Sequence, residues 1–358
     1  MKKLTAAESE VILRKASLAI DKEIARSFAM HAKGPTARMY GMLGYFMGYL
    51  DEGLKPVKRH SGKRFRSGMC LILADAYKAR ARAFDAAIAI ELFHNFTLIH
   101  DDVEDRDETR RGKPTVWKLW GINDAINSGD AQNLLVAERI ARSALLPKVG
   151  ARLSKALTDT FIEVIEGQHL DFEMAVAPIG SKLVSEERYI LMTGKKTGAL
   201  VRIAAEAAGI AAGKDARELG RLRQFSNSLG TAFQMADDYH SVWSTTAETG
   251  KDPQSDIREH KRTLPFLYAY AHLSGKKKAR LKELYSLPDQ LTVAQIQEAL
   301  DIIELTDARA YVLSRIEKYT DQAKKAARSL SVPDRTRSFL LGLIELLIPE
   351  IAERTNQA

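Results

Sequence analysis

The chain holds only one cysteine, Cys70, in 358 residues. A single thiol excludes an intramolecular disulfide and agrees with a reducing compartment, so we expect a cytoplasmic protein. Because Met69, Leu71 and Ile72 surround it, Cys70 is predicted to be a buried core thiol and not a nucleophile.

Long uncharged apolar runs are also missing from the sequence. None approaches the roughly 18 residues that a membrane-spanning helix needs. Glu8, Glu10, Arg14 and Lys15 interrupt the first apolar stretch, so neither a signal peptide nor a transmembrane segment is expected.

Proline is scarce, at 10 residues, and alternating runs of β-branched residues are few. Alanine, leucine, lysine, arginine and glutamate dominate, which is typical of an all-α protein. With 45% hydrophobic residues and no repeat or linker, residues 1–358 are predicted to form a single large helical bundle with a central cavity. The expected helices cover 5–30, 37–52, 62–80, 82–105, 123–146, 150–177, 185–211, 215–245, 257–274, 292–301, 306–329 and 335–354.

Positive charge is in excess, with a net charge of +8 and an isoelectric point near 9.3. This balance favours an anionic ligand or surface. No recognition motif or interleaved aromatic and basic pattern supports nucleic acid as a partner. The run Lys276-Lys277-Lys278 is expected to lie in a solvated loop.

The first acidic cluster is Asp101-Asp102-Val103-Glu104-Asp105, which follows a long apolar segment. That segment predicts a helix, on which positions four apart share a face, so Asp101 and Asp105 point the same way. Their charges repel, and burial raises the cost. Mg²⁺ removes the conflict because it prefers oxygen ligands and joins one or two carboxylates to a substrate phosphate. The alternative is an acidic stretch on a solvated helix face.

A second acidic cluster begins at Asp237-Asp238, again inside an apolar helical segment. Two such clusters make the solvated-face interpretation weaker. Mg²⁺ implies a phosphate-bearing ligand, so basic residues should accompany the carboxylates. Lys63 and Arg66 are predicted to share a helical face, and further basic residues near the clusters are Arg110, Arg111, Lys195, Lys196, Lys251 and Lys261. Each basic pair taken alone is typical of solvated surface.

The order and spacing of the motifs over residues 60–270 resemble those of the trans-isoprenyl diphosphate synthases, also called polyprenyl synthetases. The motifs are Gly62-Lys63-Arg64-Phe65-Arg66, Glu91-Leu92-Phe93-His94, Asp101 to Asp105, Arg110-Arg111-Gly112-Lys113-Pro114, Gly129-Asp130, Gly167-Gln168-His169-Leu170-Asp171, Lys196-Thr197-Gly198, Phe233-Gln234-Met235-Ala236-Asp237-Asp238 and residues 250–265.

The resemblance implies the isoprenoid synthase fold, a homodimer, and two substrates, isopentenyl diphosphate and an allylic diphosphate. It also implies a head-to-tail condensation that gives a linear short-chain prenyl diphosphate. Three Mg²⁺ ions would be held by Asp101, Asp105 and Asp237, with Asp102 and Asp238 in support. These three carboxylates and Lys196 would be the catalytic residues.

By the same resemblance, the allylic diphosphate would also contact Arg110, Lys196, Thr197, Gln234, Lys251 and Lys261. Isopentenyl diphosphate would lie on Lys63, Arg66, His94 and Arg111. Considered alone, His94 is more typical of a core histidine.

Product length depends, in this family, on the side chains before the first acidic cluster. Phe96 lies about 7.5 Å before Asp101 along the predicted helix, with Thr97 beside it and Phe93 one turn below. This pattern resembles geranylgeranyl (C20) diphosphate synthases, and farnesyl (C15) or longer products stay open. The alternative is that Phe96 and Phe93 only pack in the core.

The sequence departs from the family pattern at a few positions. Ser241 stands where the second cluster commonly has a third aspartate, Ser67 replaces a usual proline, and Gln254 replaces a glycine. Two alternatives to this interpretation are a terpene cyclase and a non-catalytic partner subunit. The second set of cations argues against the cyclase, and the intact first cluster argues against the partner subunit.

Overall fold

A computed structural model describes residues 4–57, 62–244 and 254–349. The prediction of an all-α protein is confirmed, because helices dominate the described residues and the strands among them are two short ones. The chain packs as two compact units. Unit 1 contains Met1–Phe161, Ile203–Leu222 and Leu330–Leu343, and unit 2 contains the remaining residues.

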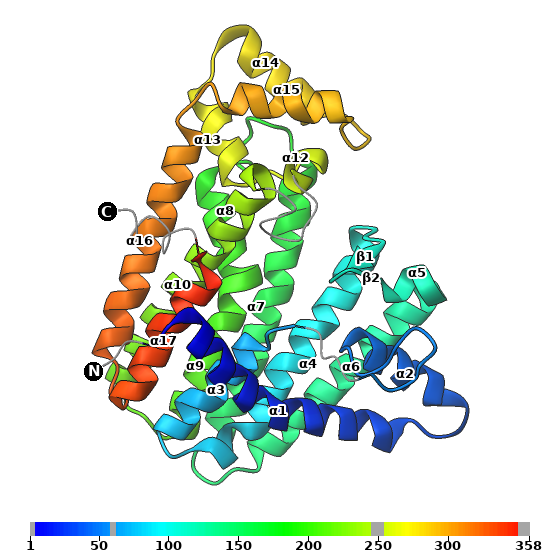
Figure 1. Cartoon of the computed structure of the whole chain (residues 1–358), viewed down its shortest axis with the longest axis vertical. Helices are drawn as coiled ribbons and strands as arrows, with labels where there is room; N and C mark the ends of the chain where they lie inside the picture. The colour runs from blue at the N-terminus through cyan, green and yellow to red at the C-terminus, as the bar shows by residue number, and fades with distance from the viewer. Residues whose placement is uncertain (1–3, 58–61, 245–253, 350–358) are drawn as a thin grey trace. The chain divides into compact units, whose positions relative to one another are not determined.

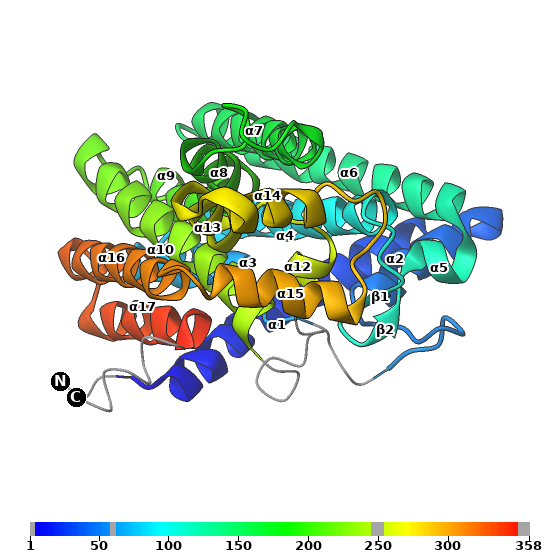
Figure 2. The same ribbon diagram turned by 90° about the horizontal axis from the view of Figure 1, so that it is seen from above.

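Unit 1 is built around α4, which packs along α6, as Figures 1 and 2 show. Cys70, in α3, is fully buried, and burial raises the pKa of its thiol to about 12, which confirms the predicted core thiol. The helices of unit 1 are α1 (Ala6–His31), α2 (Ala37–Phe46), α3 (Phe65–Ala76), α4 (Arg80–Glu104), α5 (Val116–Trp120) and α6 (Ile122–Ala144), with a 3-10 turn at Gly34–Thr36.

A β-hairpin with a two-residue loop follows α4. Strands β1 (Thr109–Arg110) and β2 (Lys113–Pro114) pair antiparallel. The connecting residues Arg111 and Gly112 both have positive φ, 54° and 72°, as a type I′ turn requires. The tight turn fixes Arg110 and Arg111 beside the end of α4.

Four helices contribute residues to both units: α7 (Gly150–Val176), α9 (Ala199–Ala211), α10 (Ala216–Trp243) and α17 (Asp334–Leu347). The remaining elements of unit 2 are α8 (Glu186–Thr193), the π-helical turn η2 (Gly194–Gly198), α12 (Ser255–Arg258), α13 (Leu264–His272), α14 (Gly275–Leu284), α15 (Val293–Ile303) and α16 (Ala308–Ser329). Inside unit 2, α13 contacts α8, α14, α15 and α16.

Three sequence-based predictions of local structure are wrong. Lys276-Lys277-Lys278 lies in the first turn of α14 and not in a loop, because lysine forms helix readily and no breaker interrupts the run. The helix predicted at 257–274 divides into α12 and α13, since His260 has a φ of 56° and Pro265 opens α13. Lys63 precedes α3 and shares no helical face with Arg66, because Arg64 is left-handed with a φ of 48°.

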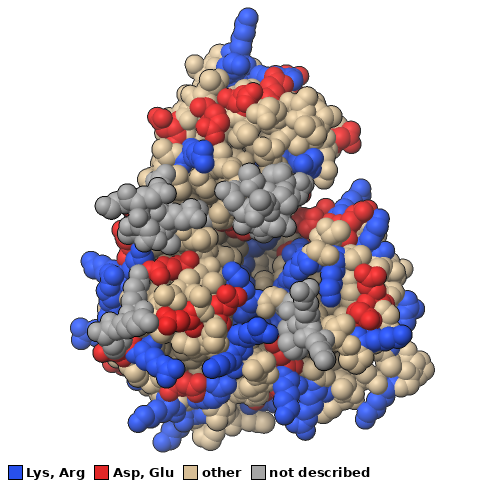
Figure 3. All heavy atoms as spheres, viewed as in Figure 1, with Lys and Arg blue, Asp and Glu red and all other residues tan. Residues whose placement is uncertain are grey.

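No helix of the described residues combines the length and the apolarity that crossing a lipid bilayer would require. On the face shown in Figure 3, Lys and Arg side chains are scattered among uncharged residues, with Asp and Glu among them.

Candidate functional site

Arg64, at the start of α3, holds the first basic motif in place. Its side chain is almost fully buried and forms ion pairs with Asp21 (3.0 Å) and Glu91 (3.1 Å). It also donates to the carbonyl oxygen of Met47 at 2.8 Å. Glu91 in turn accepts from Ser67 at 2.7 Å. These contacts satisfy the guanidinium, so Arg64 has a structural role.

Arg66, two residues later, has a different environment. Arg66 is buried and its Nη1 lies 3.0 Å from Nε2 of His94, while its Nε has no hydrogen-bond partner in the described chain. Burial lowers the pKa of Arg66 to about 10. Burial, followed by the nearby Arg66 and Arg111, holds the pKa of His94 well below its usual value, so this histidine is neutral at pH 7. Arg66 is buried, His94 is half-buried and Arg111 is exposed, so these three residues carry a positive charge that reaches from the interior to the surface.

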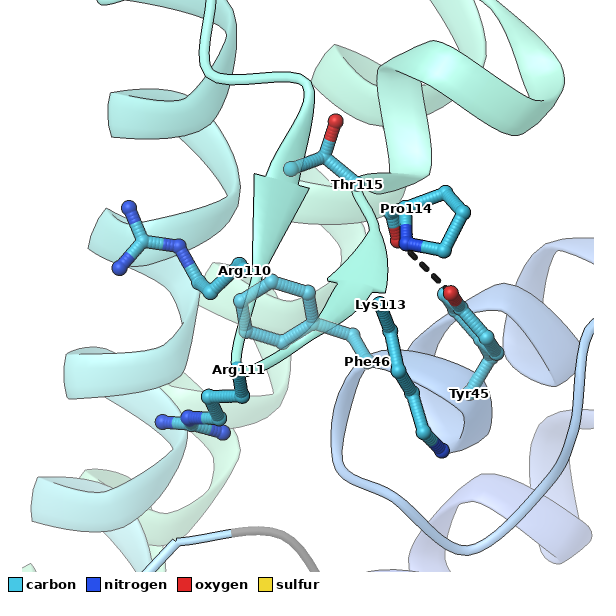
Figure 4. Close-up of a pocket in the computed structure, with 7 residues that line it drawn as sticks. All are labelled: Tyr45, Phe46, Arg110, Arg111, Lys113, Pro114 and Thr115. Atoms are coloured by element: carbon cyan, nitrogen blue, oxygen red, sulfur yellow. Dashed lines mark hydrogen bonds between the residues drawn. The ribbon is translucent and has the colours of Figure 1, made fainter. Parts of the chain in front are cut away.

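The hairpin after α4 contributes the arginines of this region, as Figure 4 shows. A small pocket there is lined by Arg110, Arg111 and Lys113 together with Tyr45, Phe46, Pro114 and Thr115. The Tyr45 hydroxyl donates to the carbonyl oxygen of Pro114 at 2.7 Å and anchors the hairpin to α2. Basic side chains beside an aromatic and apolar wall favour an anion here, although Arg110 already pairs with Asp102.

Gly62 lies close to the same cluster. It has a φ of 91°, and a Cβ atom there would lie 3.5 Å from the Cζ of Arg111. The glycine of the Gly62-Lys63 motif therefore lets the backbone adopt a left-handed conformation next to the guanidinium. Lys63 itself is exposed and lies just before α3.

The first acidic cluster lies at the carboxyl end of α4. The backbone N–H of Asp105 donates to the carbonyl oxygen of Asp101 at 2.8 Å, so the helical turn that relates their side chains is present. Asp102 is buried, accepts a hydrogen bond from Arg110, and has one oxygen, Oδ2, without a partner in the described chain. Burial raises the pKa of Asp102 to about 6. The neighbouring carboxylate of Asp107 also raises this pKa, and Arg110 opposes the shift.

Phe96 and Phe93 are both buried, inside unit 1. The ring of Phe93 stacks on that of Phe161 with centroids 4.0 Å apart, and Phe96 lies edge-on to His100 at 4.7 Å. A Cβ atom at Gly129 would lie 2.3 Å from Nε2 of His100, so this glycine gives the histidine its space. Thr97 is half-buried beside Phe96, with its hydroxyl bonded to the carbonyl oxygen of His94.

The second acidic cluster, in unit 2, has a third carboxylate that the sequence interpretation did not assign. Asp256 interacts electrostatically with Asp237 and Asp238, and all three lie within unit 2. Burial raises the pKa of Asp238 to about 7 and that of Asp256 well above its usual value. The nearby Lys261 opposes both shifts. Asp238 and Asp256 are buried and Asp237 is half-buried, so positive charge added beside them would be favourable.

Hydrogen bonds fix the orientation of Asp238. Tyr189 donates to its Oδ2 at 2.5 Å, and Gln234 donates to its Oδ1 at 2.8 Å. Thr197 donates to Gln234 at 2.8 Å and extends the chain of bonds to the π-helical turn. Tyr189 is a further residue that sequence reasoning missed, although Thr197 and Gln234 come together as the motifs implied.

Lys196 lies in that π-helical turn, a type of helical defect that often occurs at functional sites. Its ammonium is 2.6 Å from Asp171. A Cβ atom at Gly167 would lie 2.3 Å from the backbone nitrogen of Lys196. Gly167 thus lets α7 come close to the backbone of the π-helical turn, and Asp171 of the same motif pairs with Lys196.

The remaining predicted site residues are less informative. Lys261 pairs with Glu259 at 2.8 Å, and Lys251 lies outside the described residues. Within the described residues, no group of three His, Cys, Asp or Glu side chains is arranged to hold a metal ion alone. Mg²⁺ usually binds through one or two carboxylates and completes its shell with water and substrate phosphate.

Comparisons with known proteins agree with this arrangement of motifs. The family model "Polyprenyl synthetase" matches residues 49–303. A farnesyl diphosphate synthase of Mycobacterium tuberculosis is 31% identical over 315 residues, which cover 87% of this chain and 86% of the relative. A geranylgeranyl diphosphate synthase of the same organism is 33% identical over 312 residues, covering 86% and 85%.

Solved structures show the same fold. The polyprenyl synthetase of Streptomyces coelicolor superposes with a TM-score of 0.81 at 27% identity, covering 94% of this chain and 99% of that one. The polyprenyl synthase of Caulobacter crescentus, complexed with calcium and isoprenyl diphosphate, gives 0.78 at 26% identity, covering 97% and 98%. The all-α fold is therefore the isoprenoid synthase fold. By its motifs, its fold and these matches, the chain belongs to the polyprenyl synthetase family of trans-prenyl diphosphate synthases.

Proposed function

We propose that this protein is a Mg²⁺-dependent prenyl diphosphate synthase that makes a linear product, with geranylgeranyl diphosphate favoured. Family membership supplies the reaction class, a prenyl transfer with isopentenyl diphosphate and an allylic diphosphate as substrates. The observation that carries the proposal is in unit 1, where the Asp101 to Asp105 cluster and the arginine hairpin lie at the end of one helix. The carboxylates at the end of α4 and the arginines of the hairpin that follows it suit a diphosphate held through a metal ion.

The residues present fit Mg²⁺. The proposed ligands Asp101, Asp105 and Asp237 offer the oxygen atoms that this hard cation prefers. The raised pKa values of Asp102 and Asp238, both caused first by burial, mark sites where added positive charge is favourable. When bound, Mg²⁺ supplies Lewis-acid stabilisation of the negative charge that develops on diphosphate. We propose three ions, as the resemblance implies.

The protein's own residues bind and orient the two substrates in this proposal. Arg66, Arg111 and the exposed Lys63 hold isopentenyl diphosphate, and neutral His94 adds a hydrogen bond without further charge. Allylic diphosphate is held by Arg110, Lys196, Thr197, Gln234, Lys251 and Lys261. Tyr189 and Gln234 keep Asp238 in one orientation. We assign no general base to the protein.

A product assay tests this function. The protein is incubated with isopentenyl diphosphate, Mg²⁺ and dimethylallyl, geranyl or farnesyl diphosphate, and the products are identified by mass spectrometry. A ladder of linear diphosphates that ends at C20 is the expected result. Cyclic hydrocarbons would favour a terpene cyclase, and no turnover with any starter would favour a non-catalytic partner subunit.

Phe96 is proposed to form the floor that stops chain growth. Replacing Phe96 with alanine removes an aromatic ring one to two turns before Asp101, so the longest product should gain at least one C5 unit. The control is Phe28→Ala, which removes another buried ring of unit 1, in α1, and should leave product length unchanged. An unchanged product from Phe96→Ala would discard the floor and favour simple core packing.

We also propose a homodimer, which the surface of α7 supports. Ile162, Ile165, Phe172 and Val176 are 40–83% exposed and recur at helical spacing on one face. Light scattering is expected to give twice the 39.8 kDa mass of one chain. Phe172→Glu should reduce the dimer fraction, while Leu305→Glu, at an exposed apolar residue outside α7, should not. A monomer at micromolar concentration would contradict the proposal.

A further inference from the structure

A groove in unit 1 shares no residue with the site described above. It lies where the first half of α1, the carboxyl end of α3 and the first turns of α17 meet, segments that are drawn close together in Figure 1. Its volume is about 410 Å³, which falls within the range of about 300–1,000 Å³ for small-molecule sites. The groove is therefore large enough for a ligand and is not a packing defect.

The floor of the groove is apolar. Ile12 and Ala16 lie one turn apart on α1, Ile72 and Ala76 lie one turn apart on α3, and Phe339 comes from α17. Ile12, Ile72 and Ala76 are partly exposed although they are apolar. A hydrocarbon chain in the groove would remove this surface from water, which is favourable in proportion to the area covered.

The rim of the groove is positively charged. It carries Lys15, Arg80 and Arg335, against one acid, Asp75, which already pairs with Arg80 at 2.5 Å. Lys15 and Arg335 form no hydrogen bond or ion pair with any residue in the described part of the chain. Three cations and one acid leave a local charge of +2 beside the apolar floor.

The start of α17 adds to this positive potential. Arg335 and Thr336 belong to the first turn of a 14-residue helix, where backbone N–H groups lack acceptors within the helix. The helix dipole also favours an anion at this end. The helix start therefore adds to the charge of Arg335 at the part of the groove that α17 lines.

We propose that this groove is a second binding site, separate from the catalytic residues, for a free single-chain amphiphilic anion of the prenyl diphosphate class. The prenyl chain lies on the floor of Ile12, Ile72 and Ala76, and the diphosphate binds Lys15 and Arg335. The choice of prenyl diphosphate rests on the proposed function, because that class of molecule combines an apolar chain with a compact anionic group. The groove is concave, with a volume of about 410 Å³ that suits one free ligand, whereas a lipid bilayer presents a flat surface.

Photo-crosslinking tests the site with the full chain and Mg²⁺. A geranyl diphosphate that carries a benzophenone is titrated, irradiated and mapped by mass spectrometry of peptides. Labels are expected in two places: near the catalytic motifs and on peptides that contain Ile12, Ile72 or Phe339. The double variant Lys15→Glu/Arg335→Glu should weaken groove labelling by at least about tenfold, because two attractive charges become repulsive.

Matched variants separate the groove from general charge effects. Arg14→Glu/Lys22→Glu makes the same charge change at exposed positions of α1 outside the groove and should leave groove labelling unchanged. Ala76→Phe narrows the floor without changing charge and should also abolish it. Catalytic-site labelling should persist in all three variants.

Each other outcome overturns the proposal in a recognisable way. Labels at the catalytic motifs alone would reject the groove and leave the proposed function intact. No label at either place would reject both. Flotation with phosphatidylglycerol vesicles that depends on Lys15 and Arg335, without groove labelling by the free probe, would mean that the cations face a membrane instead.

Discussion

Replacing Asp101 with asparagine is expected to lower kcat/KM for prenyl transfer about a thousandfold, equivalent to roughly 4 kcal/mol of transition-state stabilisation. The substitution keeps the shape of the side chain and removes the negative charge that a divalent cation needs. Because Asp101 lies on the last full turn of α4 and accepts the backbone bond from Asp105, the helix itself should not change. Steady-state kinetics with both substrates at saturating Mg²⁺ measure the loss.

The matched control for this prediction is Glu104→Gln in the same helical turn. It removes one negative charge from an exposed residue to which no role is assigned, so kcat/KM should change by less than about threefold, as expected for one screened surface charge. If Asp101→Asn and Glu104→Gln reduced kcat/KM equally, only the total charge of the segment would matter. A near-normal Asp101→Asn enzyme would remove Asp101 from the metal site.

Substituting methionine at Arg64 and at Arg66 is expected to separate stability from substrate binding. Arg64→Met leaves Asp21 and Glu91 buried without their cation, so the free energy of unfolding should fall by about 3–5 kcal/mol. Arg66→Met removes a buried charge that has no carboxylate within ion-pair distance among the described residues. Its free energy of unfolding should change by no more than about 1 kcal/mol.

Arg66→Met should instead act on substrate binding. Arg66→Met should raise KM for isopentenyl diphosphate by about 10- to 100-fold, the value of one or two charge-assisted hydrogen bonds, with little change in KM for the allylic substrate. Denaturant unfolding and kinetics with each substrate varied in turn measure both effects. Arg14→Met, at an exposed arginine of α1, is the control and should change neither. An unaltered KM in Arg66→Met would place isopentenyl diphosphate elsewhere.

The sequence by itself determined the fold class and the reaction class. Helical periodicity and composition are local properties, so they predicted an all-α chain correctly. The Asp101 to Asp105 spacing and the ordered motifs also identified the family, because such patterns fix residue types at fixed distances along the chain. Product length stayed open, since Phe96 has the same sequence signature as a core residue and a tunnel floor.

Only the tertiary structure decided which polar residues act on one another. Arg64 and Arg66 look equivalent in sequence, yet one is neutralised by Asp21 and Glu91, both distant in the chain, and the other is not. Asp256 belonged to a family motif without an assigned role, and Tyr189 carried no local signal; both gained importance when folding placed them against the second acidic cluster. The groove with Lys15 and Arg335 arises in the same way, because burial and charge pairing depend on segments brought together from distant parts of the sequence.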